Sequence, residues 1–366
     1  MASSTLRVGP VATSAEREAW NKLAAGSPVG HRHQCLWWTE PLEQYGFRTG
    51  AIGCWKGDRL VGGALFRSYA VPLTRTTVSE CLNGPIFLDW ESAWADAFVS
   101  GVMRAAVQVN SMAVVIKDCY DRDVHRDLLA AFRRGGLVIA LTPGPADAVL
   151  RLEGRTMEQV RSGFNHGTRA RIRKGLAGPL RLRRLTQRAD LAQAYDAWMA
   201  TATRRSFTDV RPWVGLEPVL RHCIDNQLGS IFGSYLEDKL LAAAFVVHVG
   251  RTTTYVYGGY VDGAEKHSPT HMLQFEAIRE SLERGMVSYN FGNLISEGQP
   301  AGRGVDEFKL GFGATREQHL DTIVWKRKPL IYGAIERIRR GRMGQNLEGL
   351  LKRRLIERGD QASNLD

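Results

Sequence analysis

The order of predicted helices and strands repeats once along this chain, and this repeat constrains the fold more than any other feature of the sequence. In each half, a pair of helices precedes an antiparallel hairpin, and further strands alternate with helices after it, which is typical of a layered α+β domain. The first half has predicted helices at 14–25, 34–45, 92–109 and 124–134 and predicted strands at 49–56, 59–68, 113–116 and 136–142. The second half has predicted helices at 157–175, 188–205, 214–228 and 270–284 and predicted strands at 179–185, 230–236, 240–249, 252–260 and 287–291.

The length of the chain also favours two domains, because 366 residues exceed what one hydrophobic core usually serves. The Thr-Pro-Gly-Pro run at 142–145 is typical of a boundary. We therefore expect a first domain at 1–145 and a second at 146–325 that carries the active-site motifs. Isoleucines and leucines at roughly helical spacing among arginines predict that 326–366 forms basic helices packed back on the body.

The composition excludes several classes of protein. The five cysteines are scattered and never spaced as C-x-x-C, so neither a disulfide framework nor a zinc site is indicated. His31 and His33, or His267 and His271, have no third metal ligand nearby in the sequence, and we expect no metal. The longest apolar run, 240–249, is too short to span a membrane, and the N-terminus lacks a signal-peptide core. We expect a soluble, cytoplasmic protein, with a monomer favoured.

Positive charge is concentrated in two segments. Between Glu158 and Asp190 there are nine basic residues and no acidic residue, and 326–358 has eleven basic and three acidic residues. Since the formal net charge of the whole chain is +11, the remainder is mildly acidic. This segregation indicates a polyanionic partner such as a nucleic acid, although either segment could instead be a solvated helix face.

The run from Phe308 to Gly313, Phe-Lys-Leu-Gly-Phe-Gly, places one lysine among aromatic residues and glycines. A lysine can lay its stem on apolar surface and keep its ammonium in water. In a water-poor setting, however, the ammonium is either paired or placed beside developing negative charge. Lys309 is therefore our first candidate for chemistry.

Several motifs together carry a resemblance to a known family. They are Gln34–Trp38 (Gln-Cys-Leu-Trp-Trp), the basic run Arg169–Gly175, Gly-Gly-Tyr at 258–260, the helix from Pro269, Tyr289–Asn293 (Tyr-Asn-Phe-Gly-Asn) and Phe308–Gly313. Their order resembles the Fem-type transferases, which are duplicated members of the GNAT acyltransferase superfamily, over nearly the whole chain. The resemblance implies two tandem GNAT-like domains, each with a mixed, mostly antiparallel sheet flanked by helices.

The resemblance also implies an activity. Fem-type transferases use an aminoacyl-tRNA as donor and form an amide on an acceptor amine, commonly in a cell-wall precursor, while relatives attach amino acids to peptide or nucleoside natural products. It implies that no cofactor is needed and that Arg169, Arg171, Arg173 and Lys174 bind tRNA. The basic segments independently favour a nucleic-acid partner.

Two other classes of function remain open. An acetyl-CoA-dependent GNAT N-acyltransferase needs a Gln/Arg-x-x-Gly-x-Gly/Ala loop that cradles pyrophosphate at a helix N-terminus. The string at 299–304 fits, but it follows the predicted strand 287–291, and we expect no amphipathic helix at its end. Ahead of the predicted helix 270–284, the segment 263–270 does not fit. The third class is a non-catalytic RNA-binding protein on a degenerate GNAT scaffold.

The predicted mechanism assigns roles to a few side chains. The ester of an aminoacyl-tRNA is already activated, so the enzyme must place the amine and stabilise an oxyanion. By resemblance to the family motif, Lys309 holds the oxyanion or the tRNA terminus, and Phe308 and Phe312 exclude water. Tyr257, Tyr260 and Asn290 are candidate pocket residues. The general base remains open among four candidates, Asp306, Glu307, Tyr257 and His267, and the proton could instead leave through the substrate.

The acceptor is the least determined partner. Arg205 and Arg211 lie where relatives place an arginine on a nucleotide-linked acceptor, and both are candidate anion clamps. Where those relatives carry a lysine after the early tryptophan, this chain has Thr39, Glu40 and Pro41. A small peptide or nucleotide-linked acceptor is expected, from a cell-wall precursor or from a secondary metabolite.

Overall fold

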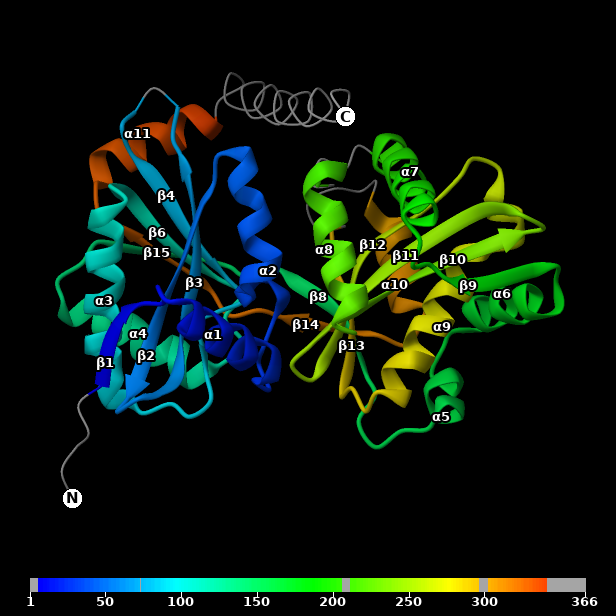
Figure 1. The fold of residues 1–366 in the computed structure, drawn as a ribbon, viewed down its shortest axis with the longest axis horizontal. Coiled ribbons are helices and arrows are strands. Elements are labelled where there is room, and N and C mark those ends of the chain that lie inside the picture. Colours follow the sequence, from blue (N-terminus) through cyan, green and yellow to red (C-terminus); the bar gives the residue numbers. More distant parts are fainter. Residues whose placement is uncertain (1–5, 73, 206–210, 296–301, 341–366) are drawn as a thin grey trace. The chain divides into compact units, whose positions relative to one another are not determined.

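The computed structural model describes residues 6–72, 74–205, 211–295 and 302–340 and divides the chain into two compact units (Figure 1). The first unit comprises Met1–Gly144 and His319–Asp366, and the second comprises Pro145–Gln318. Each unit has one mixed, mostly antiparallel sheet with helices packed against it. The predicted α+β duplication is confirmed.

The sheet of the first unit has eight strands in the order β1-β2-β3-β4-β6-β15-β7, with β5 paired to β3. Only β4 and β6 pair in parallel among its described strands. The strands are β1 (Leu6–Pro10), β2 (Arg48–Lys56), β3 (Arg59–Ala70), β4 (Thr77–Leu82), β5 (Ile86–Phe87), β6 (Ser111–Lys117), β7 (Ile139–Thr142) and β15 (Thr322–Lys326). The helical segments are α1 (Ser14–Gly26), η1 (Arg32–Gln34), α2 (Leu36–Thr39), η2 (Glu40–Tyr45), η3 (Ser92–Trp94), α3 (Ala95–Gln108), α4 (Arg122–Arg134) and α11 (Pro329–Arg340).

Both faces of this sheet bury apolar side chains. Helices α3 and α4 cover one face, where Phe98 and Phe132 pack on Val114 and Trp325. The alternate residues of the same strands point to the other face, where Tyr332 and Ile335 of α11 pack on a second cluster that includes Val115 and Val324. The start of the predicted C-terminal basic segment therefore does pack on the body, while residues 341–366 lie outside the described residues.

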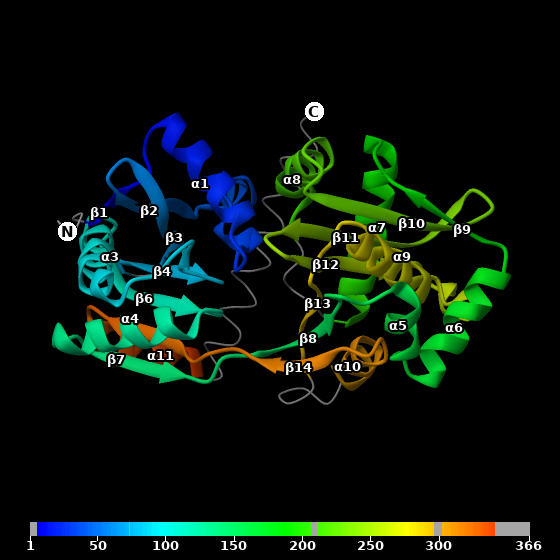
Figure 2. The same ribbon diagram turned by 90° about the horizontal axis from the view of Figure 1, so that it is seen from below.

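The sheet of the second unit has seven strands in the order β14-β8-β13-β12-β11-β10-β9, and β12 and β13 are its parallel pair (Figure 2). The strands are β8 (Ala146–Arg151), β9 (Leu180–Arg184), β10 (Gly229–Leu236), β11 (Lys239–Val249), β12 (Thr252–Tyr260), β13 (Ser288–Asn293) and β14 (Thr315–Gln318). The helical segments are α5 (Met157–Ser162), α6 (His166–Ala177), α7 (Arg188–Arg205), α8 (Trp213–Asp225), η4 (Ala264–His267), α9 (Pro269–Glu283) and α10 (Arg303–Leu310).

Helices α5, α6 and α9 contribute Val160, Ile172 and Leu273 to the core on one face of this sheet. Helix α7 covers the other face, where the Trp198 indole donates to the carbonyl oxygen of Ala243 at 3.0 Å. The second unit therefore has a three-layer arrangement of helices, sheet and helices.

The second unit ends earlier than the predicted boundary at residue 325. From His319 the chain returns to the first unit, where β15 inserts between β6 and β7 as an antiparallel partner of both. A strand that pairs with residues more than 170 positions earlier leaves no local signal. The boundary near residue 145 has no such complication, because Gly144 ends the first segment of unit one.

Some local expectations were wrong. The predicted helix 34–45 is broken at Cys35, which is extended, and again after Thr39, where Pro41 lacks the N–H that would continue α2. The predicted helix 157–175 is interrupted at 163–165. The sequence reading also missed several elements, all of them short or edge segments without a clear period. These are β1, β4, β5, β8, β14, β15 and α10.

Candidate functional site

The parallel strands of the second unit separate halfway along their length. Residues Thr252–Thr254 of β12 pair with Ser288–Asn290 of β13, and no pairing joins the two strands beyond that point. Because Phe245 lies opposite Tyr257 while Val246 lies opposite Tyr255, β12 also carries a bulge at this level. The carboxyl ends of parallel strands in open sheets are favoured positions for ligands. The candidate site therefore begins at this parting.

Helix α10 lies against the end of β13 and carries Lys309. Its carboxylate Asp306 accepts hydrogen bonds from the backbone N–H of Ile295 at 3.0 and 3.1 Å, which fastens the helix to the segment after β13. The Nζ of Lys309 donates to the carbonyl oxygen of Asn293 at 2.5 Å, and the side chain is only 9% exposed. The alternative, in which the ammonium of Lys309 stays in water, does not fit this burial.

The negative charges of two buried carboxylates act on the buried ammonium of Lys309. Burial lowers the pKa of Lys309, while the charges of Asp306 and Asp147 oppose that shift. Asp147, which is 4% exposed, accepts a 2.7 Å hydrogen bond from the amide of Asn290 through one carboxylate oxygen, and Asn290 in turn accepts from the N–H of Gly292. The result is a positive charge held in a water-poor setting, which is the arrangement that stabilises a developing oxyanion.

Aromatic rings enclose the other side of the same helix. Phe312 is fully buried and contacts Phe291, Phe164 and Phe308 at centroid distances of 5.3–5.4 Å. Direct contact between Phe312 and a substrate does not fit this burial, so its contribution is packing. Phe308 is partly exposed and remains available to exclude water.

The sequence reading missed His271 as a member of this cluster. It lies in the first turn of α9, with its ring 5.0 Å from that of Phe308 and 5.8 Å from that of Phe312. Burial, assisted by the charge of Arg171, lowers the imidazole pKa to about 4, so the ring is neutral at pH 7. Its buried Nδ1 has no hydrogen-bond partner among the described residues. The sequence offered only its i, i+4 spacing from His267, a possible metal pair that was set aside because no third ligand is nearby in the sequence.

The basic helix α6 packs directly on the segment that carries Lys309. The N–H of Asn165, the N-cap of α6, donates to the carbonyl oxygen of Gly311 at 2.9 Å. A Cβ at Gly311 would lie 2.6 Å from the hydroxyl of Thr168, and Gly313 has a positive φ of 74°. Both glycines are therefore required for this close approach.

The four predicted tRNA-binding residues do not have equal roles. Arg169 is half-buried and donates to the carbonyl oxygens of Ser162 and Phe164, so it fastens α6 to the end of α5. Arg171, Arg173 and Lys174 are exposed. Three cations thus remain available to a polyanion on this helix.

Tyr257 and Arg211 lie across the parting from Asn290. The ring of Tyr257 packs on Trp198 of α7 at 5.6 Å, and its hydroxyl accepts from the N–H of Arg211 at 3.4 Å. Asn290 alternates with the core residues Tyr289 and Phe291, so it faces the same side of the sheet as Tyr257. The structure therefore places Tyr257 and Asn290 on one face, on either side of the parting.

The remaining predicted acceptor residues differ in exposure. Tyr260 contacts the core on the α9 side, and the guanidinium of Arg204 lies 4.5 Å above its ring. Arg205 is exposed at the end of α7, and Arg211 is only 8% exposed. Of the candidate bases, Asp306 is committed to Ile295, whereas Glu307 is exposed on α10 and His267 is half-buried in η4.

The end of β12 does not carry the phosphate-cradling loop of a CoA enzyme. Helix α9 begins at Pro269, after the 3-10 turn η4 and after Ser268 in a left-handed conformation with φ of 56°. The expectation that no amphipathic helix follows the string at 299–304 was wrong, because α10 begins at Arg303. Residues 299–301 of that string lie outside the described residues.

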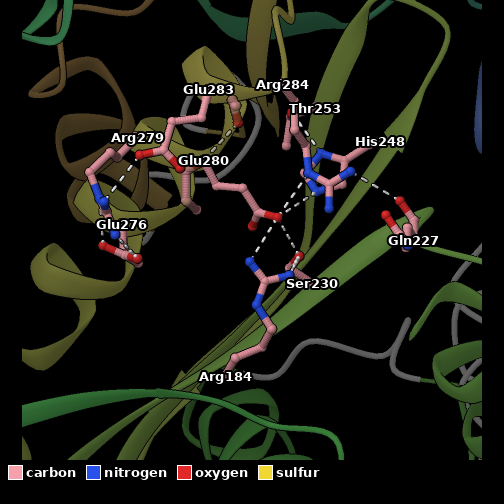
Figure 3. A network of polar contacts seen from close by, with 12 residues as sticks. Arg184, Gln227, Ser230, His248, Thr253, Glu276, Arg279, Glu280, Glu283 and Arg284 are labelled. Carbon is pink, nitrogen blue, oxygen red and sulfur yellow. Dashed lines mark hydrogen bonds and ion pairs between the residues drawn. The ribbon is translucent and has the colours of Figure 1, made fainter. Parts of the chain in front are cut away.

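A second polar network ties the opposite end of α9 to the sheet (Figure 3). Glu280 accepts a hydrogen bond from Ser230 at 2.9 Å and forms ion pairs with Arg284 at 2.8 Å and Arg184 at 2.9 Å. His248, 3.8 Å away, bonds to Thr253 at 2.9 Å. This network lies near the start of β12 and the end of α9, and its role is therefore structural.

Among the described residues, no group of three or more His, Cys, Asp or Glu side chains is arranged to hold a metal.

Comparison with known proteins agrees with this geometry. Residues 162–313 match the acetyltransferase (GNAT) domain family. FemX is 15% identical over 87% of this chain and 98% of its own, with a TM-score of 0.76. The C-terminal domain of a putative lysylphosphatidylglycerol synthetase from Agrobacterium fabrum is 12% identical over 88% of this chain and 95% of its own, with a TM-score of 0.57.

A tandem GNAT protein from the clavulanic acid biosynthesis pathway is 9% identical over 89% of this chain and 99% of its own, with a TM-score of 0.52. No curated protein matches the chain in sequence. The fold is thus the duplicated GNAT acyltransferase fold. The motifs predicted a fold of this kind, and the fold of FemX is similar to that of this chain over most of its length. None of the helices in the described ranges has the length and hydropathy to span a membrane.

Proposed function

We propose that this protein is an aminoacyltransferase that moves an amino acid from aminoacyl-tRNA to an acceptor amine. The observation that carries this proposal is the direct packing of the basic helix α6 on the segment that holds Lys309, through Asn165 and Gly311. Exposed cations for a polyanion on α6 and a buried cation for an acyl-transfer centre on α10 thus lie on two segments that are joined directly.

The chemistry needs little more than positioning. The acceptor nitrogen attacks the ester carbonyl carbon, the new C–N bond forms, the C–O bond to the ribose breaks, and the amine proton ends on the ribose oxygen. Lys309 has three N–H donors and uses one on Asn293. The others stabilise the oxyanion of the tetrahedral intermediate or hold the terminal ribose or phosphate of the tRNA. Phe308 limits the entry of water that would hydrolyse the ester.

The acceptor is an amine on a small peptide or a nucleotide-linked molecule, from a cell-wall precursor or a peptide or nucleoside natural product. Arg211 supplies a buried guanidinium beside Tyr257 and Arg205 an exposed one, and guanidinium groups bind phosphate and carboxylate in bidentate geometry. The reaction needs no cofactor, because the ester already carries the activation. We place it in the cytoplasm, where charged tRNA is made.

The strongest competing function is acetyl-CoA-dependent N-acylation. The match of 162–313 to the GNAT domain family and the parting of β12 and β13 both suit an acyl donor of either kind. The start of α9 favours the tRNA donor, because Pro269 and the preceding turn η4 stand where the pyrophosphate loop is needed.

One experiment separates the two functions. The purified chain is incubated with total tRNA charged with one labelled amino acid at a time, with a nucleotide-linked peptide as acceptor. We expect one or a few labels to be protected from ester hydrolysis and transferred. Product that persists after ribonuclease digestion of the donor would exclude the tRNA mechanism, and calorimetric binding of acetyl-CoA would then favour the alternative.

A further inference from the structure

The first unit contains a cavity of about 270 Å³ between the C-terminal half of α3 and strands β1 to β4. Its walls are mostly apolar and include Val8, Ile52, Phe66, Val102, Val109 and Val114. Small-molecule sites in proteins are concave and mainly apolar, with a few polar groups that orient the ligand. All lining residues belong to the first unit, so the cavity does not depend on the second.

Glycines create this space. A Cβ added at Gly50 of β2 would meet no atom within 4 Å, so the volume above this residue is open. By contrast, a Cβ at Gly101 of α3 would lie 2.4 Å from a methyl group of Val8, so that glycine lets β1 close the far wall. The cavity is therefore built into the pattern of small residues.

The polar groups at the floor are already satisfied. The hydroxyls of Ser68 and Ser79 are 2.8 Å apart, Ser79 donates to Ser111 at 3.1 Å, and Ser111 donates to the carbonyl oxygen of Ala113 at 2.6 Å. These hydroxyls keep their hydrogen-bond partners when an apolar ligand binds. The ligand therefore avoids the cost of about 1–3 kcal/mol that a buried hydroxyl without a partner would carry.

The charged residues of the lining are both arginines, Arg48 and Arg104, and both are exposed. Arg48 lies opposite Ser68 in the sheet register, so it stands at the edge of the cavity beside the serine floor. The nearby carboxylate of Glu43 accepts hydrogen bonds from the backbone and hydroxyl of Thr49. The opening is therefore net positive and favours an anionic head group.

We propose that this cavity binds an apolar carboxylate of about ten non-hydrogen atoms. A cavity of about 150 Å³ holds benzene, so the larger volume here suits a branched or straight chain of about eight carbons with its carboxylate outside. The apolar chain occupies the space above Gly50, and the carboxylate lies between the arginines and solvent.

Calorimetric titration of the full chain with octanoate tests this site, with octan-1-ol as the neutral probe of equal chain length. We expect octanoate to bind with a dissociation constant of about 0.1–1 mM, a range set by its small number of atoms. Arg48→Gln should weaken octanoate roughly threefold and leave octan-1-ol unchanged, since exposed ion pairs contribute little. Arg59→Gln, an exposed arginine outside the cavity, is the matched control.

Filling the cavity gives the stronger test. Gly50→Val places a β-branched side chain in the open volume of a strand, where such residues are favoured, and should abolish binding of both probes. Gly333→Val on α11, where space is equally open, should change neither. If Gly50→Val fails to fold by circular dichroism, Ala105→Leu fills the cavity from α3. Absence of octanoate binding to the unaltered chain, or equal binding to the filled variant, would refute the proposal.

Discussion

The two units share one topology but treat their parallel strand pair differently. In the first unit, β4 and β6 pair from Thr77 opposite Ser111 to Leu82 opposite Lys117, with one register shift after Thr77 and an unbroken ladder from Val78 onward. In the second unit, β12 and β13 pair at three positions and then part. A continuous ladder leaves no room between strands, whereas a parting exposes backbone groups and admits a ligand. The difference favours the second unit as the place of the proposed acyl transfer.

Side chains reinforce the difference. Across the closed pair of the first unit, Glu80 forms ion pairs with Lys117 at 2.7 Å and Arg67 at 2.9 Å. At the parting of the second unit, a lysine instead bonds a backbone carbonyl while its charge faces two carboxylates at longer range. Lys117 thus stabilises the strand pair of the first unit, whereas Lys309 retains N–H donors for a substrate.

The largest effect that this comparison predicts is on transfer activity. Lys309→Met should lower the rate of amide formation about 10²- to 10³-fold, because it removes an oxyanion donor from a water-poor site. Single-turnover kinetics with charged tRNA measure this, and circular dichroism checks the fold. The matched variant Lys117→Met should retain activity within about twofold and lose about 1 kcal/mol of stability through its half-exposed ion pair. Equal activity loss in both variants would contradict the assignment.

A second prediction concerns the buried glutamates that stabilise each unit. Glu280→Gln leaves two arginines without their carboxylate and should cost about 3 kcal/mol of unfolding free energy, as should Glu80→Gln in the first unit. Scanning calorimetry should show each substitution lowering a different unfolding transition. Glu283→Gln, whose side chain is 59% exposed, should shift neither by more than about 0.5 kcal/mol. A single transition shifted equally by both would show that the units do not unfold separately.

Acidification should destabilise both units through buried histidines. Burial, with the charge of Arg284, lowers the pKa of His248 to about 4 from a usual value of 6.5, and the pKa of His31 is also well below its usual range through burial and Arg32. A lowered pKa means that the folded state binds fewer protons, so stability is complete above pH 6.5 and is lost as the pH falls towards 4. Between pH 7 and 4.5, urea unfolding should show His248→Gln losing about 2.5 kcal/mol less than the unaltered chain. Equal losses would mean that His248 titrates normally.

The sequence could predict the duplicated fold because both copies carry long periodic elements, such as α3 and the β2–β3 hairpin in the first unit and α7 and the β10–β11 hairpin in the second. It also singled out Lys309, since a lysine among aromatic residues is rare at random. It could not predict β15, whose partners are distant in sequence, or the clustering of His271 with Phe308, which depends on the packing of α9 against α10. Phe312 shows that a motif can also mislead about the role of one of its residues, because an aromatic residue in a functional motif can be wholly structural.

The smallest predicted effect distinguishes a tRNA surface from general positive charge. Arg171→Gln and Arg173→Gln, on the exposed face of α6, should each weaken tRNA binding roughly two- to fivefold and reduce the salt dependence of log Kd by about one contact. Arg133→Gln and Arg134→Gln, at the exposed end of α4 in the first unit, change charge equally. They should leave Kd unchanged at 150 mM salt if the nucleic acid is bound by α6. Filter binding across a salt series measures both pairs. Equal weakening by the two pairs would show that overall charge, and not the helix beside Lys309, attracts the RNA.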